Sequence, residues 1–257
     1  MTEAPLADAR AKMLWADRHA DALYREVRAF VGRKSARIAH DIEPETGDHV
    51  FWMNLAEEPP LGEWGLILGD VLHNLHSALD ALAWQLASIG LGREPTEKEA
   101  PGISFPIRKR PEDFASASLE HFTSTHRGML GEVQPYKRGH EALWTLRQLS
   151  NRDKHRIILP TYLMHEDFKL TVSVVRDCEI VSVTHTPPGP FKDGRELARV
   201  KVAIAGPELE TEGHAKLSGY IALSDGTRLQ HLIDRIGKEV RRILSDFEPT
   251  VSSHLLG

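Results

Sequence analysis

One stretch of the chain concentrates short polar residues at helical spacing. Within positions 69–86, leucines recur every three or four residues, and a second set on the opposite side of the helical wheel consists of Asp70, His73, Asn74, Ser77 and Asp80. Asp, His, Asn and Ser favour caps and turns, whereas a helix face in water is more often Glu, Lys, Arg and Gln. The pattern therefore predicts a polar face that packs against another helix and forms a hydrogen-bonded network. The alternative is a face that is simply exposed to solvent.

A second helix, expected over about 139–158, carries Asn151 and His155 four residues apart. We expect this pair to meet the first polar face. A histidine held by a carboxylate is suited to acid–base chemistry near neutral pH, and nearby cations can contact phosphate. The candidate catalytic residues are therefore His155, Asn151, His73 and Asp80, and the candidate substrate-binding residues are Asp70, Asn74, Ser77, Lys154 and Arg156. The alternative for Asn151 and His155 is a role at the helix end, where they would bond terminal carbonyls.

Four segments resemble a widespread set of bacterial proteins that have no assigned activity. They are LGDVLHNLHSALD (68–80), FPI (105–107), QPY (134–136) and LSNRDKHR (149–156). The resemblance covers most of residues 6–160 and implies a shared fold.

More distantly, the helical part is similar to HEPN domains, which are helical bundles found in RNases of toxin–antitoxin and phage-defence systems. Their active site combines an arginine, a small polar residue and a histidine on a late helix, and two copies associate. Asn151 and His155 match the polar residue and the histidine, but Ser150 occupies the arginine position. The resemblance implies RNA or a nucleotide as the ligand and a homodimer as the assembly.

Two other functions compete with an RNA-directed one. His73, His76 and His155, together with Asp80, are residue types that bind metal ions, but their spacing matches no established motif, so no cofactor is assigned. The other alternative is a non-catalytic structural or regulatory protein, in which the polar cluster is only a buried network.

Composition excludes several function classes. The chain has 257 residues and a net charge of −5, so no broad basic surface favours nucleic-acid or membrane binding, although a small basic pocket remains compatible with it. The single cysteine excludes an intramolecular disulfide and fits a reducing compartment. No secretory signal and no membrane-length apolar run are present. We therefore expect a soluble, cytoplasmic protein with no membrane partner.

Periodicity predicts an α+β fold in a single domain over 1–257. We expect a HEPN-like helical bundle with an antiparallel sheet made from an N-terminal hairpin and C-terminal strands. The expected parts are a helical core over 6–160, a β-rich part over 165–223 and a C-terminal helix over 225–248. Within them, the predicted helices span 6–31, 63–89, 112–131 (broken) and 139–158, and the predicted strands span 35–42, 49–55, 170–175, 179–184, 197–204 and 217–223.

Overall fold

The computed structural model describes residues 6–33, 36–155, 161–169, 179–203 and 216–255. It contains helices and antiparallel sheets, as the sequence predicts for an α+β protein. No helix in these ranges is long and apolar enough to cross a membrane.

The chain divides into two compact units, where the sequence predicts one domain. The helical unit consists of Met1–Leu23, Trp64–Leu159 and Gln230–Gly257, and the β unit consists of Tyr24–Glu63 and Pro160–Leu229. The N-terminal hairpin lies within the β unit, where its second strand pairs with a later strand.

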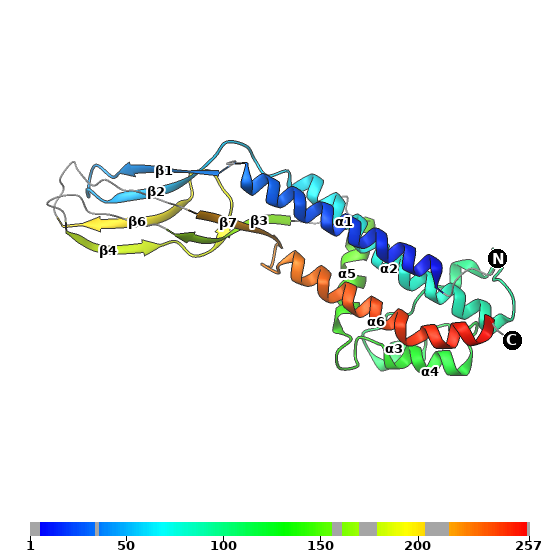
Figure 1. Cartoon of the computed structure of the whole chain (residues 1–257). Helices are drawn as coiled ribbons and strands as arrows, with labels where there is room; N and C mark the ends of the chain where they lie inside the picture. Colours follow the sequence, from blue (N-terminus) through cyan, green and yellow to red (C-terminus); the bar gives the residue numbers. More distant parts are fainter. Residues whose placement is uncertain (1–5, 34–35, 156–160, 170–178, 204–215, 256–257) are drawn as a thin grey trace. The chain divides into compact units, whose positions relative to one another are not determined.

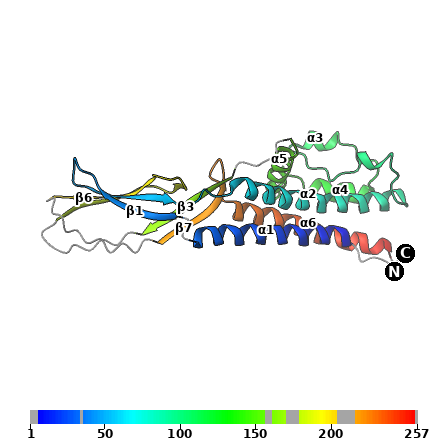
Figure 2. The same cartoon turned by 90° about the horizontal axis from the view of Figure 1, so that it is seen from above.

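Three long helices dominate the helical unit, and they run beside one another (Figures 1 and 2). They are α1 (Ala7–Gly32), α2 (Leu61–Leu91) and α6 (Leu229–Leu255). The remaining helical segments are η1 (Ala100–Gly102), α3 (Pro111–Ala115), α4 (Ser124–Glu132) and α5 (Glu141–His155). The predicted helices over 6–31 and 63–89 are confirmed, and the one over 139–158 is confirmed as far as His155, since its last residues lie outside the described ranges. The broken helix over 112–131 corresponds to α3 and α4.

Buried leucines explain why α2 forms where the periodicity places it. The predicted core stripe is fully buried, and it consists of Leu72, Leu75, Leu79, Leu82 and Leu86. Each such side chain removes apolar surface from water, which contributes about 1.5–3 kcal/mol relative to exposure. The apolar stripe of α6 is buried in the same way, from Leu229 to Val251.

In its described residues, the β unit contains two antiparallel sheets. The first has the order β1-β2-β6-β4, made from β1 (Ala36–Ile42), β2 (His49–Leu55), β6 (Glu196–Val202) and β4 (Ile180–His185). This sheet confirms the predicted union of the N-terminal hairpin with later strands. Gly47, with a φ of +73°, allows the tight turn between β1 and β2.

The second sheet has the order β5-β3-β7, made from β5 (Gly189–Pro190), β3 (Thr161–Lys169) and β7 (Lys216–Leu223). The sequence does not predict the strand β3, because Glu166 and Asp167 interrupt the alternation of apolar residues. The pairing of β3 with β7 shifts register at the same place, between His165 and Asp167. The strand predicted over 170–175 lies outside the described residues.

Candidate functional site

The first half of the α2 polar face lies toward solvent. Asp70 and His73 are exposed, and Asn74 and Ser77 are half-buried. Their hydrogen-bond contacts stay within about one helical turn. Asn74 Nδ2 donates to the Asp70 carbonyl at 2.8 Å, and the Ser77 hydroxyl lies 3.4 Å from His73 Nε2. These four residues therefore form local pairs along the helix.

Asp80 behaves differently from the rest of this face. One of its carboxylate oxygens accepts a hydrogen bond from the backbone N–H of Phe105 at 3.0 Å, and the other lies 3.1 Å from His76 Nδ1. Asp80 thus connects α2 to a segment 25 residues further along the chain.

The predicted residues of α5 are described only in part. Asn151 is exposed, whereas Ser150 is buried and its hydroxyl has no hydrogen-bond partner among the described residues. The side chains of Lys154 and His155, and the whole of Arg156, lie outside the description. The expected meeting of His73 or Asn74 with Asn151 or His155 therefore stays a prediction.

The described part of the chain contains no preformed cluster of the kind that the metal-binding alternative requires. There, no three His, Cys, Asp or Glu side chains gather closely enough to hold a metal ion. His73 and His76 are described, but His155, the third predicted ligand, is not.

A different polar cluster involves the backbone of residues 105–108. This segment is neither helix nor strand, so its N–H and C=O groups need other partners. Three side chains from three parts of the helical unit supply them: Asp80, Gln134 and Arg147. We call these three side chains the 105–108 clamp.

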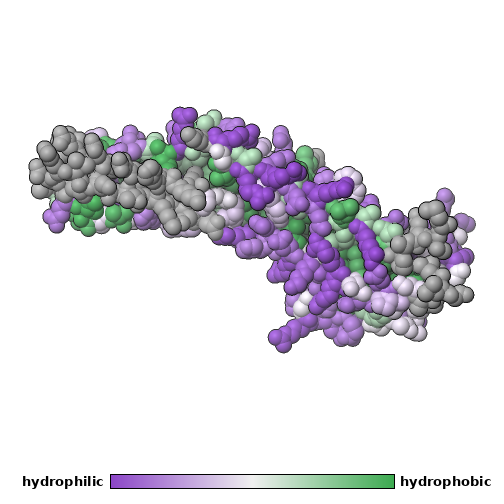
Figure 3. All heavy atoms as spheres, in the orientation of Figure 1, coloured by the Kyte–Doolittle hydropathy of each residue, from purple (hydrophilic) through white to green (hydrophobic). Residues whose placement is uncertain are grey.

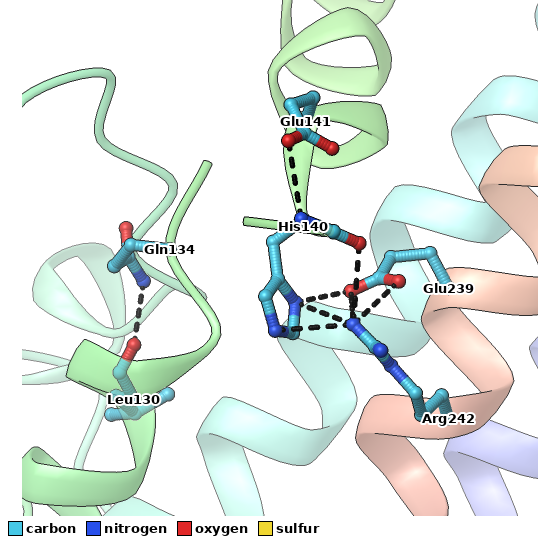
Figure 4. Close-up of polar contacts among 7 residues, drawn as sticks. Leu130, Gln134, His140, Glu141, Glu239 and Arg242 are labelled. Atoms are coloured by element: carbon cyan, nitrogen blue, oxygen red, sulfur yellow. Dashed lines mark hydrogen bonds and ion pairs between the residues drawn. The ribbon is translucent and has the colours of Figure 1, made fainter. Parts of the chain in front are cut away.

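Of the three side chains of the clamp, Gln134 makes the most hydrogen bonds to the segment. It is fully buried; its amide oxygen accepts from the Arg108 N–H at 2.8 Å, and its amide nitrogen donates to the Pro106 carbonyl at 2.6 Å and to the Leu130 carbonyl at 2.8 Å. The Gln134–Leu130 bond is visible in Figure 4. Arg147 donates to the Ile107 carbonyl. Every described bond of the clamp to this segment ends on a backbone atom.

The clamp presents two cationic residues to a pocket. Arg108 ends the clamped segment and Lys109 follows it, and with residues in and directly after α3 and residues of α5 they line an open pocket of about 400 Å³. We call it the basic pocket, and its lining consists of Arg108, Lys109, Asp113, Ser116, Ala117, Trp144 and Arg147. The ammonium of Lys109 lies 5.6 Å from the centre of the Trp144 ring, and the guanidinium carbon of Arg147 lies 5.8 Å from it. Both distances fit cation–π contacts.

The charges of the basic pocket do not balance. Burial, and then the neighbouring Arg108, lower the pKa of Arg147, which still keeps its charge because a guanidinium starts far above neutral pH. Asp113 is the one carboxylate of the lining, and two hydrogen bonds from Arg110, at 3.0 and 3.1 Å, hold its pKa below the usual range. Asp113 is already paired with Arg110. The pocket therefore carries excess positive charge from Arg108, Lys109 and Arg147.

The start of α5 is anchored to α6, as Figure 4 shows. His140, directly before α5, contacts the buried carboxylate of Glu239. Arg242 completes the group: its guanidinium lies 2.9 Å from Glu239 and 2.9 Å from His140 Nδ1. Trp144 and Arg147 lie one and two helical turns further along α5, so this anchor fixes where the two side chains stand.

Comparisons with protein-family models, with curated proteins and with solved structures found no match to this chain. The site therefore has to be judged on its own geometry.

Sequence reasoning placed Asp80 in the candidate site but missed the pocket-lining cations. Two signals could have found them. The basic run Arg108-Lys109-Arg110 directly follows the Phe-Pro-Ile segment, and Trp144 and Arg147 are spaced to share one face of a helix.

Proposed function

We propose that the protein binds RNA or a nucleotide through its phosphate groups, and that the basic pocket is the binding site. The observation that carries the proposal is the gathering of three cationic side chains in one pocket, two of them over the Trp144 ring, in a chain with a net charge of −5. A local positive pocket in an acidic protein is selective for anions and does not attract nucleic acid over the whole surface.

The residue types suit this ligand. Arginine presents a planar fork that bonds two phosphate oxygens, and lysine adds a point charge. A bound phosphate would also relieve the repulsion between Arg108 and Arg147. Trp144 is half-buried, so part of its ring is open for stacking with a base, which is how many proteins hold unpaired nucleotides.

Cleavage of a bound RNA is the extension of this proposal that the HEPN resemblance implies. Asn151 lies four residues after Arg147, and position 155 continues the same spacing along α5. His155 would act as the acid or base, with Lys154 or Arg156 near the phosphate and with His73 and Asp80 in supporting roles. We therefore expect His155→Ala to abolish RNA cleavage measured with EDTA present, with an unchanged melting temperature.

The structural alternative gives a different result for the same variant. If His155 only completes a buried network, His155→Ala lowers the free energy of unfolding by about 1–3 kcal/mol and changes no activity. A wild-type protein that does not cleave RNA in this assay removes the enzymatic extension. The contacts of Asp80 with Phe105 and His76 favour the structural alternative for that residue.

Binding itself is tested with the cations that are least involved in folding. No bond of the clamp involves the side chains of Arg108 and Lys109, so their removal leaves the clamp intact. We expect the double variant Arg108→Gln/Lys109→Gln to bind a fluorescein-labelled single-stranded RNA at least about tenfold more weakly than the wild type, since a hydrogen bond to a charged group contributes about 1.5–3 kcal/mol. Fluorescence anisotropy at fixed salt measures it, with ATP and tripolyphosphate as competitors.

The matched control is Lys98→Gln, which removes an exposed positive charge from the loop that follows α2. It should bind the labelled RNA as the wild type does. Equal affinities of the wild type and the double variant, or no competition by ATP or tripolyphosphate, would contradict phosphate binding in the basic pocket.

A further inference from the structure

Four charged residues form a rectangle on the face shared by α1 and α6. Arg10 pairs with Glu248 at one end, and Asp17 pairs with Arg241 at the other. In both helices the two charges are seven residues apart, which is two helical turns or about 10 Å. Positive and negative charges therefore alternate around the rectangle, with like charges on its diagonals.

The centre of the rectangle is a groove with apolar walls. Its volume is about 390 Å³, and besides the four charged residues its lining includes Met13, Leu14 and Leu244. Met13 and Leu244 are buried, whereas Leu14 is 52% exposed. In Figure 3, hydrophobic atoms lie between hydrophilic ones over this region of α1 and α6.

We infer that this face, independently of the basic pocket, binds a second copy of the same chain. Two copies placed face to face are related by a two-fold axis that lies in the plane of contact. If that axis runs along the helices, Arg10 of one copy faces Glu248 of the other; if it runs across them, Arg10 faces Asp17. In both cases every corner meets an opposite charge, so the face is complementary to itself.

The exposure of the four charges supports this assignment. The side chains of Arg10, Asp17 and Arg241 are 48–54% exposed, and that of Glu248 is 35% exposed, although each is already in an ion pair. Exposed pairs of this kind contribute little to folding. They remain able to accept a second partner across an interface, where the charges select the partner and Leu14 adds apolar contact.

Charge-reversed variants test the assignment. The acidic variant Arg10→Glu/Arg241→Glu makes all four corners negative, and the basic variant Asp17→Arg/Glu248→Arg makes all four positive. Sedimentation velocity should show a dimer for the wild type, with dissociation rising at high salt. It should show a monomer for each variant alone. An equimolar mixture of the two variants should form a heterodimer, identified by native mass spectrometry.

Two further variants complete the experiment. Lys98→Glu/Arg127→Glu makes the same change in net charge as the acidic variant, at exposed positions outside the lining of the groove, and it should dimerise as the wild type does. Leu14→Ser changes no charge and should weaken the dimer, so it decides the case if circular dichroism shows that a charge variant is unfolded. A monomeric wild type, a dimer unaffected by the substitutions, or a mixture that stays monomeric would overturn the assignment.

Discussion

The polar face of α2 and the segment 105–108 both concentrate polar groups, but these groups find partners in different ways. On α2, Asp70 with Asn74 and His73 with Ser77 pair within one turn of the same helix. Around 105–108, the partners come from side chains that are distant in sequence. Local pairs cost little to break because water replaces them, whereas loss of a buried long-range partner leaves a backbone group unsatisfied. Polar residue types alone therefore do not identify the polar residues that matter for the fold.

The largest expected effect is at Gln134. Gln134→Leu keeps a similar volume but removes the partners of the Arg108 N–H and of the Pro106 and Leu130 carbonyls. We expect it to lower the free energy of unfolding by about 3–5 kcal/mol, because each buried unsatisfied group costs about 1–3 kcal/mol. Urea denaturation measures the change. Gln148→Leu, at an exposed position of α5, is the control and should change stability by less than about 0.5 kcal/mol.

Leu79 provides an apolar reference for the same helix that carries the polar face. Leu79→Ala should lower the free energy of unfolding by about 2–4 kcal/mol, because the side chain is fully buried and its loss opens a cavity. Glu97→Ala, in the exposed loop after α2, should change it by less than about 0.5 kcal/mol. Similar small changes for both variants in denaturant melts would mean that the leucine face is not the core.

The comparison is sharpest between two aspartates of α2. Asp80→Ala should lower the free energy of unfolding by about 1–2 kcal/mol, because the Phe105 N–H loses its acceptor. Asp70→Ala should have almost no effect, since that side chain is exposed. The two variants are compared in one series of urea melts. An equal loss in both would show that the α2 face is a single network.

The smallest expected effect is on how steeply the free energy of unfolding changes with pH, and it concerns a histidine of the β unit. His165 is buried there; burial and then the charge of Arg195, whose Nε donates to His165 Nε2 at 3.2 Å, lower its pKa below 6.5. The unfolded chain therefore binds a proton that the folded chain does not, and stability falls as pH drops below about 6.5. His165→Gln should make stability less dependent on pH between about 6.5 and 5, as measured by urea melts across that range. If the free energy of unfolding changed with pH as steeply in the variant as in the wild type, other histidines would be the cause of the pH dependence.

The elements that depend on periodicity could be predicted from the sequence, and the site could not. The leucines of α2 and the apolar residues of α6 repeat at helical spacing, so the sequence predicts which face of each helix is buried. Gln134 shows the opposite case. In the sequence it is only the first residue of the turn Gln-Pro-Tyr. Its bond to Pro106 could not be predicted, because Pro106 lies 28 residues away and no local pattern encodes a contact over that distance. Asp80 belongs to the candidate site by residue type, whereas its described contacts are with the Phe105 N–H and with His76 on its own helix.

Because the clamp contacts peptide groups, it imposes almost no requirement on the side chains that the clamped segment carries outward. Arg108 could be exchanged for a neutral or acidic residue and its N–H would still reach Gln134, and Lys109 takes part in no clamp bond. Folding and the charge of the basic pocket are thereby encoded by different atoms of the same few residues. Such a separation resembles that of a framework and its variable loop. Substitutions at 108 and 109 can therefore change the charge of the basic pocket without first having to be compensated elsewhere in the helical unit.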